Sequence, residues 1–319
     1  MTTKLYDAII IGGGPAGLTY ASFLARQAYS TLVLDSRQYR NELSSHMHTI
    51  PGWDHVAPSE FRAKSRADLE KRYPMVEFKD LTVSKVRKGD DGIFEAEVEG
   101  GEIFRARKLG LATGVKDLVE EEPKGFAECW TKGIFHCMFC HGFEERGVES
   151  VGVLATGSLA AAQVLHHVVP MAARFATKNV TIYTDGNGAL HSEAASIFQS
   201  PKITTDNRKI QSYALRGDGP AMTITFEDGD SKEEGFCVNQ PRMRQRGPFA
   251  EQLGLDMGEG GVEIKAVPPF YETSVRGCFA AGDAATPMKS VLQAMYMAGS
   301  GGVGMVMQLG AEADEEGRL

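Results

Sequence analysis

The chain has 319 residues, a formal net charge of −8 at pH 7 and a hydrophobic fraction of 42%. Its length allows large buried cores and indicates about two domains. The negative charge argues against general affinity for nucleic acid or anionic lipid. No apolar run approaches the roughly 20 residues that a membrane-spanning helix needs, and the N-terminal residues lead into an apolar strand without a cleavable targeting segment. We therefore expect a cytoplasmic protein with no nucleic-acid partner and no membrane association.

The first element in the chain is a dinucleotide-binding pattern. Residues 7–11 form a short apolar run typical of a buried parallel strand, and residues 18–27 have helical character. The glycine-rich segment between them fits G-x-G-x-x-G, and a second strand at 31–34 ends at an acidic residue about 20 positions later. Such glycines let backbone N–H groups approach a pyrophosphate at a helix N-terminus, and the acidic side chain accepts hydrogen bonds from a ribose. The dinucleotide contacts predicted here are Gly12, Gly14, Pro15, Ala16, Gly17, Asp35 and Ser36.

The middle of the chain alternates strands with turns and contains a second pattern of the same kind. Strands are expected at 78–87, 93–99, 108–114, 221–226 and 235–238. The strand at 108–114 ends in the glycine turn Ala112-Thr113-Gly114. A second βαβ-like unit begins at residue 150, where strands at 151–154 and 180–183 are separated by a turn and a long helix.

The C-terminal region contains one more strand and one long helix. Residues 277–281 form a strand that runs into Gly282 and Asp283. The helix expected at 291–309 is rich in Gly, Ala and Met, which permits either close packing over a ligand or a tightly packed core helix. We expect the acidic tail at 312–316 to be disordered.

Five cysteines are too few, and odd in number, for a disulfide-stapled scaffold. Cys129, Cys237 and Cys278 stand alone, so we interpret them as small core residues. Cys137 and Cys140 differ because they form C-x-x-C, which in a reducing compartment indicates a redox pair or half of a zinc site.

A zinc site requires further ligands at short spacing, and the sequence has no second C-x-x-C. The histidines that flank the pair, His136 and His141, are directly adjacent to the cysteines and are poor partners for one tetrahedral ion. We therefore predict a redox pair and no bound metal.

Four features occur in one order: the glycine fingerprint, Ala112-Thr113-Gly114, the C-x-x-C and Gly282-Asp283. This order resembles the low-molecular-weight thioredoxin reductase family over nearly the whole chain. The resemblance implies an α/β protein with two Rossmann-like (FAD/NAD(P)-type) three-layer domains, the second inserted into the first. The FAD-binding domain is then discontinuous, at 1–117 and 242–319, and the inserted NAD(P)H-binding-like domain at 118–241 carries the redox pair. A homodimer is also implied.

Longer runs are similar to a fungal branch of that family, which contains the gliotoxin-type dithiol oxidases. These runs are Arg40-Asn41, residues 46–48, residues 52–55, residues 137–147 and residues 268–275. Enzymes of this branch close the transannular disulfide of epipolythiodioxopiperazine metabolites with FAD and O2. The resemblance therefore implies FAD as cofactor, with a small-molecule dithiol and O2 as reaction partners.

The resemblance also extends the predicted FAD contacts beyond the fingerprint. Gly282 and Asp283 would lie over the ribityl and phosphate groups, and Gln293 and Ala294 beside the isoalloxazine. His46 and His48 lie near Trp53 in the first excursion of this domain and line a substrate pocket, contact the flavin or are structural. The added contacts are Arg40, Asn41, His48, Ala112, Thr113, Gly114, Gly282, Asp283, Gln293 and Ala294.

The second nucleotide-binding unit departs from what NADPH requires. Its turn, residues 155–160, has Ala155 in place of the first glycine. The segment 184–191 after the next strand has no Arg or Lys for a 2′-phosphate, and its Asp185 would repel that group. The alternative is an NADPH site that takes its cations from elsewhere, and Arg208 and Lys209 are candidates.

We predict that Cys137, Cys140, His141 and Glu144 are catalytic. Two residues between the sulfurs close a small ring, which we expect at a helix start, where the N-terminal dipole lowers a thiol pKa. A substrate thiolate attacks Cys137, by resemblance the more exposed sulfur. His141 manages protons or caps the helix, and Glu144 orients the ring or is a solvated acid.

Two other functions stay open from the sequence. An NADPH-dependent thioredoxin reductase would need a working site in the second nucleotide-binding unit. A flavin-containing redox sensor would bind FAD and undergo reversible C-x-x-C chemistry without turnover.

Overall fold

The computed structural model describes residues 4–318 and separates into two compact units. Unit 1 contains residues 4–46, 50–116 and 244–318, and unit 2 contains Met47–Thr49 and Asp117–Met243. The first three residues of the N-terminal segment, in which we expect no targeting signal, lie outside the described range. Within that range, no helix combines the length and the apolar character needed to cross a bilayer.

Unit 1 is built on a seven-stranded sheet with the order β3-β2-β1-β6-β5-β4, and β17 also pairs with β6. The pairs β1–β2, β2–β3, β1–β6 and β6–β17 are parallel, whereas β4 and β5 pair in antiparallel fashion. The strands are β1 (Leu5–Ile11), β2 (Thr31–Leu34), β3 (Val76–Lys79), β4 (Val83–Lys88), β5 (Phe94–Val98), β6 (Ile103–Leu111) and β17 (Cys278–Ala280).

The prediction of one strand at 78–87 is wrong, because β3 and β4 are separate strands. β3 pairs with β2 at one end of the strand order, whereas β4 pairs with β5 at the other end, so one continuous strand cannot make both pairings. Asp80 lies at this break, and its carboxylate pairs with Arg66 and Arg37. The charged residue is thereby kept at the surface rather than within a strand.

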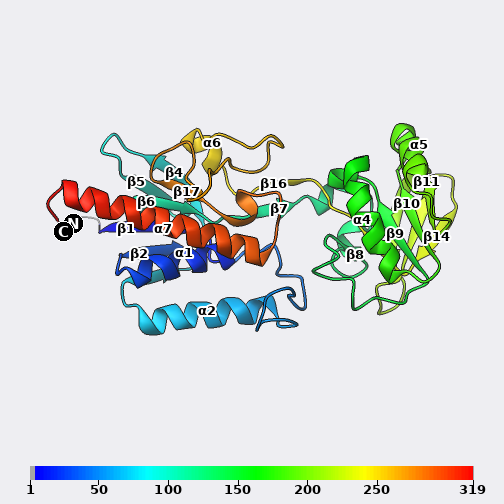
Figure 1. Ribbon diagram of the computed structural model, residues 1–319, viewed down its shortest axis with the longest axis horizontal. Helices are drawn as coiled ribbons and strands as arrows, with labels where there is room; N and C mark the ends of the chain where they lie inside the picture. The colour runs from blue at the N-terminus through cyan, green and yellow to red at the C-terminus, as the bar shows by residue number, and fades with distance from the viewer. Residues whose placement is uncertain (1–3, 319) are drawn as a thin grey trace. The chain divides into compact units, whose positions relative to one another are not determined.

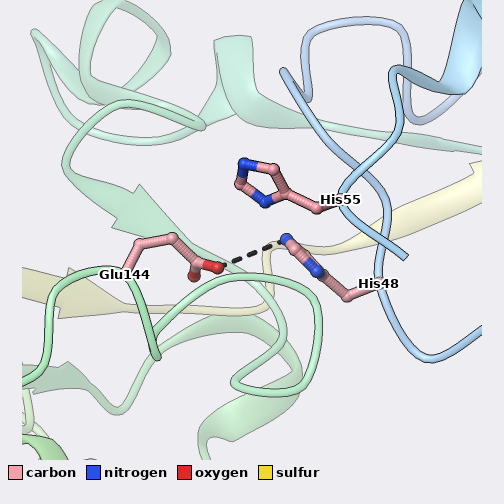
Figure 2. Close-up of side chains that lie close together, drawn as sticks. All are labelled: His48, His55 and Glu144. Atoms are coloured by element: carbon pink, nitrogen blue, oxygen red, sulfur yellow. Dashed lines mark ion pairs between the residues drawn. The ribbon is translucent and has the colours of Figure 1, made fainter.

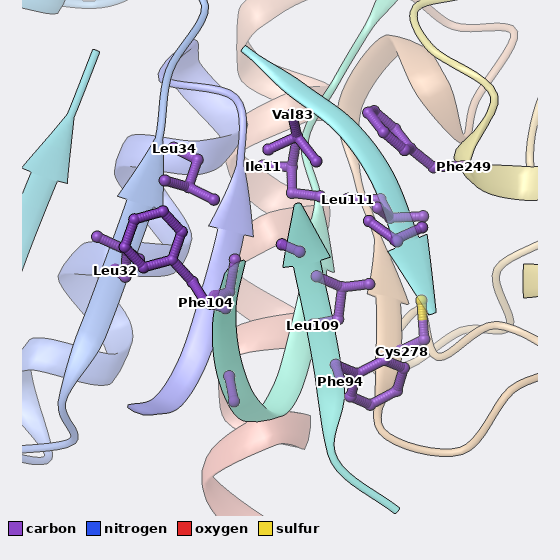
Figure 3. Packing of buried hydrophobic residues seen from close by; sticks show 14 of the residues in the cluster. Ile11, Leu32, Leu34, Val83, Phe94, Phe104, Leu109, Leu111, Phe249 and Cys278 are labelled. Carbon is purple, nitrogen blue, oxygen red and sulfur yellow. The ribbon is translucent and has the colours of Figure 1, made fainter. Parts of the chain in front are cut away.

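The core of unit 1 lies against the sheet face shown in Figure 3. Alternate residues of the strands, including Ile11, Leu34, Leu109 and Leu111, are almost fully buried there beside Phe94. The residues between them, such as Ile10 and Val33, are fully buried in a second cluster, so both faces of these parallel strands are covered. The helices of unit 1 are α1 (Pro15–Arg26), α2 (Pro58–Arg72), α6 (Phe249–Leu253) and α7 (Val291–Glu315), with a short 3₁₀ turn η3 (Gly282–Ala284).

Helix α7 runs alongside α1, as Figure 1 shows, and its small residues allow close packing there. A Cβ atom at Gly302 would lie 2.7 Å from Cβ of Phe23, and one at Gly301 would lie 2.7 Å from the Tyr20 hydroxyl. One at Gly304 would lie 2.8 Å from Phe279. These contacts favour the core-helix interpretation for this part of α7.

The expectation of a disordered acidic tail is wrong, because α7 continues to Glu315. Glu312 pairs with Lys108 of β6, whose side chain is only 4% exposed. Burial lowers the pKa of Lys108, and the Glu312 carboxylate opposes that shift. A buried ammonium group needs a partner, so this ion pair ties the end of the helix to the sheet.

Unit 2 contains a five-stranded parallel sheet and a smaller antiparallel one. The parallel order is β11-β10-β9-β15-β8, and β12, β13 and β14 form the antiparallel sheet. The strands are β8 (Ile134–Phe135), β9 (Ser150–Leu154), β10 (Asn179–Tyr183), β11 (Ile203–Asp206), β12 (Ile210–Leu215), β13 (Met222–Phe226), β14 (Ser231–Glu234) and β15 (Phe236–Val238). The predicted α/β class with Rossmann-like parallel sheets is confirmed.

The helical elements of unit 2 are short except for one. They are η1 (Val119–Glu121), α3 (Phe126–Cys129), η2 (Gly157–Leu159), α4 (Ala162–Phe175) and α5 (Gly188–Ile197). A two-stranded sheet joins β7 (Val115–Asp117) to β16 (Met243–Gln245), at the two places where the chain passes between the units.

The three isolated cysteines are buried, as predicted. Cys129, Cys237 and Cys278 are at most 1% exposed. Burial raises the pKa of each thiol, that of Cys278 to about 12. A thiol that stays protonated at neutral pH is a weak nucleophile, so these residues serve packing rather than exchange.

Candidate functional site

Cys137 and Cys140 form a disulfide bond, with their Cα atoms 5.2 Å apart. They lie in a series of turns between β8 and β9 and not at the start of a helix, so that expectation is wrong. Local backbone hydrogen bonds shape the loop instead. The Cys140 N–H donates to Cys137 O (3.1 Å), and the His141 N–H donates to the same oxygen (3.0 Å).

A backbone N–H group of the loop lies within hydrogen-bond distance of the Cys137 sulfur. The Cys140 backbone N–H lies 3.1 Å from Cys137 Sγ. A hydrogen-bond donor at this position favours the thiolate over the thiol when the disulfide opens. A backbone N–H therefore supplies the stabilisation that we expected from a helix dipole.

His141 is held by an aromatic ring and a carboxylate. Its ring stacks on Phe135 of β8, with centroids 3.9 Å apart. Its Nε2 atom lies 2.9 Å from Glu145 Oε1. An ionised carboxylate only accepts hydrogen bonds, so Nε2 carries the hydrogen and Nδ1 is the nitrogen that can take up a proton.

The partner of His141 is thus Glu145 and not Glu144, the residue that sequence analysis selected. Glu145 belongs to the same run, residues 137–147, and its i+4 spacing from His141 is the sequence signal that identifies it as the partner. The residues fold into turns rather than a helix, but the backbone still brings the two side chains together.

Glu144 has other partners in unit 2. Its carboxylate accepts a hydrogen bond from the Gly142 N–H (3.2 Å). It also pairs with His48, whose Nε2 atom lies 3.3 Å away; the dashed line in Figure 2 marks this ion pair. Burial opposes its ionisation, but backbone N–H groups and the nearby His141 and His48 rings lower its pKa overall. Two predicted site residues, His48 and Glu144, therefore lie together in unit 2.

In unit 1, the predicted dinucleotide contacts gather at one edge of the sheet. The Gly12 N–H donates to Leu34 O (2.8 Å) and the Ala112 N–H to Ile11 O (2.9 Å), while the Ala281 N–H donates to Leu111 O (3.1 Å). The carboxyl ends of four parallel strands, β1, β2, β6 and β17, thus share this edge. Ligands of open α/β sheets bind there.

The glycines of the first turn have distinct spatial requirements. A Cβ at Gly12, whose φ is +108°, would lie 2.3 Å from Ala112 O, and one at Gly17 would lie 1.8 Å from Gly12 O. These two positions need glycine for the fold itself. Gly14 differs, because no atom lies within 4 Å of a Cβ built there. The space above Gly14, before Pro15 at the first position of α1, is open to a ligand.

Gly282 brings two further predicted segments to the same place. It has a φ of +73°, and a Cβ on it would lie 3.2 Å from Ala294 and 3.3 Å from Ala16. The first turn of α7, with Gln293 capped by the Ser290 hydroxyl, therefore packs close to the first turn of α1.

Asp35 is buried at the end of β2 and already has protein donors. It accepts hydrogen bonds from the Arg37 N–H (3.0 Å) and from the Tyr39 hydroxyl. Burial, together with this bond to Asp35, raises the pKa of Tyr39 to about 12. Ser36 follows Asp35 directly at the same strand end.

Arg40 and Asn41 continue the loop after β2. Arg40 pairs with Asp283 of η3 (2.9 Å), which links two residues predicted to contact the cofactor. Asn41 accepts a hydrogen bond from Arg62 (2.9 Å), and the Arg62 guanidinium lies 3.8 Å from the centre of the Tyr39 ring. Thr113 and Gly114 follow Ala112 at the end of β6.

The corresponding turn in unit 2 is built differently. A 3₁₀ turn, η2, separates β9 from α4, so the helix begins only at Ala162. The Ser158 N–H donates to Gln240 O (2.8 Å), and a Cβ at Gly157 would lie 2.6 Å from the same oxygen. An N–H group that a pyrophosphate would use is therefore bound to the protein itself.

The two candidate cations of unit 2 differ in availability. The Arg208 guanidinium is paired with Asp206 (2.7 Å) and Asp230 (3.3 Å) and lies over the Phe226 ring. Lys209 is exposed, and its side chain packs beside Gly186 in the loop after β10. Asp185, in the same loop, accepts a hydrogen bond from the Ile210 N–H (2.8 Å).

Two features of the structure can be compared with known protein families. One is the glycine turn at the end of a parallel strand in unit 1, and the other is the cysteine pair in the second nucleotide-binding-like unit. The model for pyridine nucleotide-disulphide oxidoreductases matches residues 6–302. The chain belongs to this family. Its members and their structural neighbours are FAD-binding flavoproteins, so the predicted cofactor, FAD, is confirmed.

Known proteins of similar sequence align with almost the whole of this chain. Thioredoxin reductase aclD of Aspergillus oryzae is 43% identical, over 97% of this chain and 98% of its own length. Thioredoxin reductase tcpT of Claviceps purpurea is 42% identical, over 92% and 91%. A crystal structure of an oxidoreductase from Agrobacterium tumefaciens superposes with a TM-score of 0.82 at 30% identity, over 96% and 99%. The resemblance to thioredoxin reductase-like flavoproteins is confirmed.

The edge of the unit 1 sheet fits FAD. The open space at Gly14 admits a pyrophosphate, the carboxylate of Asp35 lies where a ribose is bound, and the absence of a side chain at Gly282 lets α7 approach. We infer that this flavoprotein holds FAD with these residues.

Gly14→Ala tests this assignment, because the added methyl group fits the protein but occupies the space for the pyrophosphate. We expect the variant to fold with an unchanged melting temperature as apoprotein and to purify with less than about a tenth of the normal flavin content. Flavin absorbance per chain is the measurement. Gly219→Ala is the control, because Gly219 is also open on all sides and lies in unit 2. Normal flavin content in Gly14→Ala would contradict the assignment.

Glu145→Gln tests whether Glu145, rather than Glu144, positions His141. The amide keeps the size of the side chain but no longer fixes the hydrogen on Nε2, since it both donates and accepts. We expect the rate at which a dithiol reduces the enzyme to fall about tenfold, with an altered pH profile, whereas Glu144→Gln keeps the shape of the profile. Equal effects of the two substitutions would show that the 2.9 Å contact has no special role.

Proposed function

We propose that this oxidoreductase is an FAD-dependent dithiol oxidase. It closes an intramolecular disulfide in a small dithiol metabolite of the epipolythiodioxopiperazine type, through Cys137 and Cys140. O2 is the final electron acceptor and is reduced to H2O2. Motif similarity to the gliotoxin-type branch supports the substrate class.

The observation that carries the proposal is the contrast between the two nucleotide-binding turns. The turn at Gly14 is open, whereas the unit 2 turn is occupied by the bond from Ser158 to Gln240. Arg208, one of two candidate partners for a 2′-phosphate, is neutralised by aspartates. A protein with poor means to bind NADPH must take its electrons from another donor, and the half-buried cysteine disulfide offers a route from a thiol.

The chemistry of the cysteine pair follows from its surroundings. A substrate thiolate attacks Cys137 Sγ, which breaks the Cys137–Cys140 bond and forms a mixed disulfide. The second substrate thiolate then attacks the substrate sulfur of that bond and expels Cys137. The Cys140 N–H, 3.1 Å from Cys137 Sγ, stabilises the departing thiolate. The substrate is oxidised by two electrons, and the enzyme ends with two reduced cysteines.

His141 is placed to move the protons of these steps. Its Nδ1 can take a proton from an incoming thiol and return it to a cysteine thiolate, while Glu145 holds Nε2. When bound, FAD would supply the two-electron chemistry by which the reduced cysteines return to the disulfide and O2 is reduced, with two protons, to H2O2.

The relatives are named thioredoxin reductases, which favours a second candidate function, an NADPH-dependent thioredoxin reductase. The exposed Lys209 beside Gly186 is the feature of unit 2 that agrees with it. In that case electrons would flow from NADPH through FAD to the cysteines, and on to an external disulfide.

Anaerobic mixing with NADPH or with a small dithiol separates the two functions. We expect the dithiol to bleach the flavin absorbance, and NADPH to do so at least about a hundredfold more slowly. Air admitted afterwards should restore the yellow colour with the release of H2O2. Cys140→Ser should abolish reduction by the dithiol, because no disulfide can form.

Fast bleaching by NADPH together with no reaction of the dithiol would contradict the oxidase and support the reductase. Reduction by a dithiol without repeated turnover in air would instead indicate a redox sensor.

A further inference from the structure

We propose that Phe139 and Phe143 form an aromatic platform beside the disulfide that selects dithiols with an apolar, ring-bearing body. This inference rests on the proposed dithiol oxidation and specifies which substrates the site prefers. Neither side chain takes part in the electron transfer itself.

The rings of Phe139 and Phe143 are unusually exposed for aromatic side chains of unit 2. Phe139 is 71% exposed and Phe143 is 62% exposed. Among the described residues of unit 2, no other large hydrophobic side chain is as exposed. The other large aromatic side chains there are half-buried, as Phe175 and Phe198 are, or buried, as Tyr183 and Phe236 are. Exposed phenylalanine rings add nothing to core packing, and such groups commonly mark binding sites.

Both residues are close in the chain to the reactive bond, Phe143 following Cys140 by three residues. Phe139 lies between Cys137 and Cys140 in the small ring that the disulfide closes. Its neighbour Met138 points inward and is only 7% exposed, so the loop sends one side chain to the core and the other to the surface. A thiol that attacks Sγ of Cys137 must come within side-chain reach of Phe139.

Phe143 is also held in a fixed position. The Arg146 guanidinium lies 3.9 Å from the centre of its ring, and Arg146 Nη1 donates to Phe143 O (2.7 Å). Cation–π stacking of this kind covers one face of the ring and fixes its orientation. Gly142, before it, has a φ of +151°, which L side chains rarely adopt, and a Cβ there would make a tight contact of 3.0 Å with Phe175.

This arrangement favours one class of substrate. An apolar or aromatic dithiol removes water from both rings as its sulfur reaches Cys137, and aromatic stacking adds to that gain. A dithiol whose body consists of hydroxyl groups gains little from the same contact, because its groups lose hydrogen bonds to water.

The test compares two dithiols in the anaerobic reduction of the flavin. Benzene-1,2-dimethanethiol has an aromatic body and dithiothreitol a hydroxylated one. For Phe139→Ala we expect the half-saturating concentration of the aromatic dithiol to rise about tenfold, with the maximal rate changed less than about twofold. With dithiothreitol, both parameters should stay within about twofold of the wild type. Comparison of variant with wild type for each dithiol cancels the difference in their intrinsic reactivity.

Three further variants make the comparison decisive. Phe139→Leu keeps an apolar side chain and should recover part of the loss, and it also serves if the alanine variant folds poorly. Phe143→Ala should show the same selectivity to a smaller degree. Met307→Ala removes an apolar side chain that is 57% exposed from α7 in unit 1 and should change the kinetic parameters of neither dithiol.

An equal change for both dithiols in Phe139→Ala, or no change for either, overturns the platform while the proposed oxidation stands. Failure of both dithiols to reduce the wild-type flavin overturns the proposed function, and this inference falls with it.

Discussion

The disulfide between Cys137 and Cys140 is the feature on which the rest of the chemistry depends. It is formed by two residues of one tight loop, so its two sulfurs stay together when it opens. The loop itself supplies a backbone donor to Cys137 Sγ, and Phe135 and Glu145 fix the orientation of His141 beside it. In the proposed mechanism, these few residues of unit 2 provide an electron-pair carrier, a hydrogen-bond donor for the thiolate that it releases and a proton carrier.

The two units share a parallel-sheet plan but differ at the turn where a nucleotide would bind. In unit 1 the helix begins at once after the glycines, and the space above Gly14 is open. In unit 2 a 3₁₀ turn precedes the helix, and the Ser158 N–H, which a pyrophosphate would use, donates to Gln240 O instead. The same fold is thus open to a dinucleotide in one unit and closed by its own hydrogen bond in the other. Under the proposed function, this difference lets a member of the pyridine nucleotide-disulphide oxidoreductase family take its electrons from a thiol.

Sequence reasoning predicted the parts of the fold that short-range patterns determine. The strand–turn–helix around Gly12 and Gly17 requires glycine for steric reasons that are visible in the spacing. It failed where tertiary contacts decide: the acidic tail is helical because Glu312 reaches the buried Lys108. The C-x-x-C segment makes a single turn, closed by the hydrogen bond from the His141 N–H to Cys137 O, and does not continue into a helix. Sequence reasoning also selected Glu144 over Glu145, since only the backbone path of residues 141–145 shows which carboxylate reaches the imidazole. The exposure of Phe139 was likewise not predictable, because neighbouring Met138 is equally apolar yet buried.

The most direct measurement is an anaerobic reductive titration of the purified flavoprotein with dithionite, followed by flavin absorbance and by alkylation of newly formed thiols. A cysteine pair in redox contact with FAD requires about four electrons per chain, two for the disulfide and two for the flavin, with two thiols appearing as the titration proceeds. Uptake of about two electrons, with the thiols of Cys137 and Cys140 absent at the end, would contradict the electron relay between them.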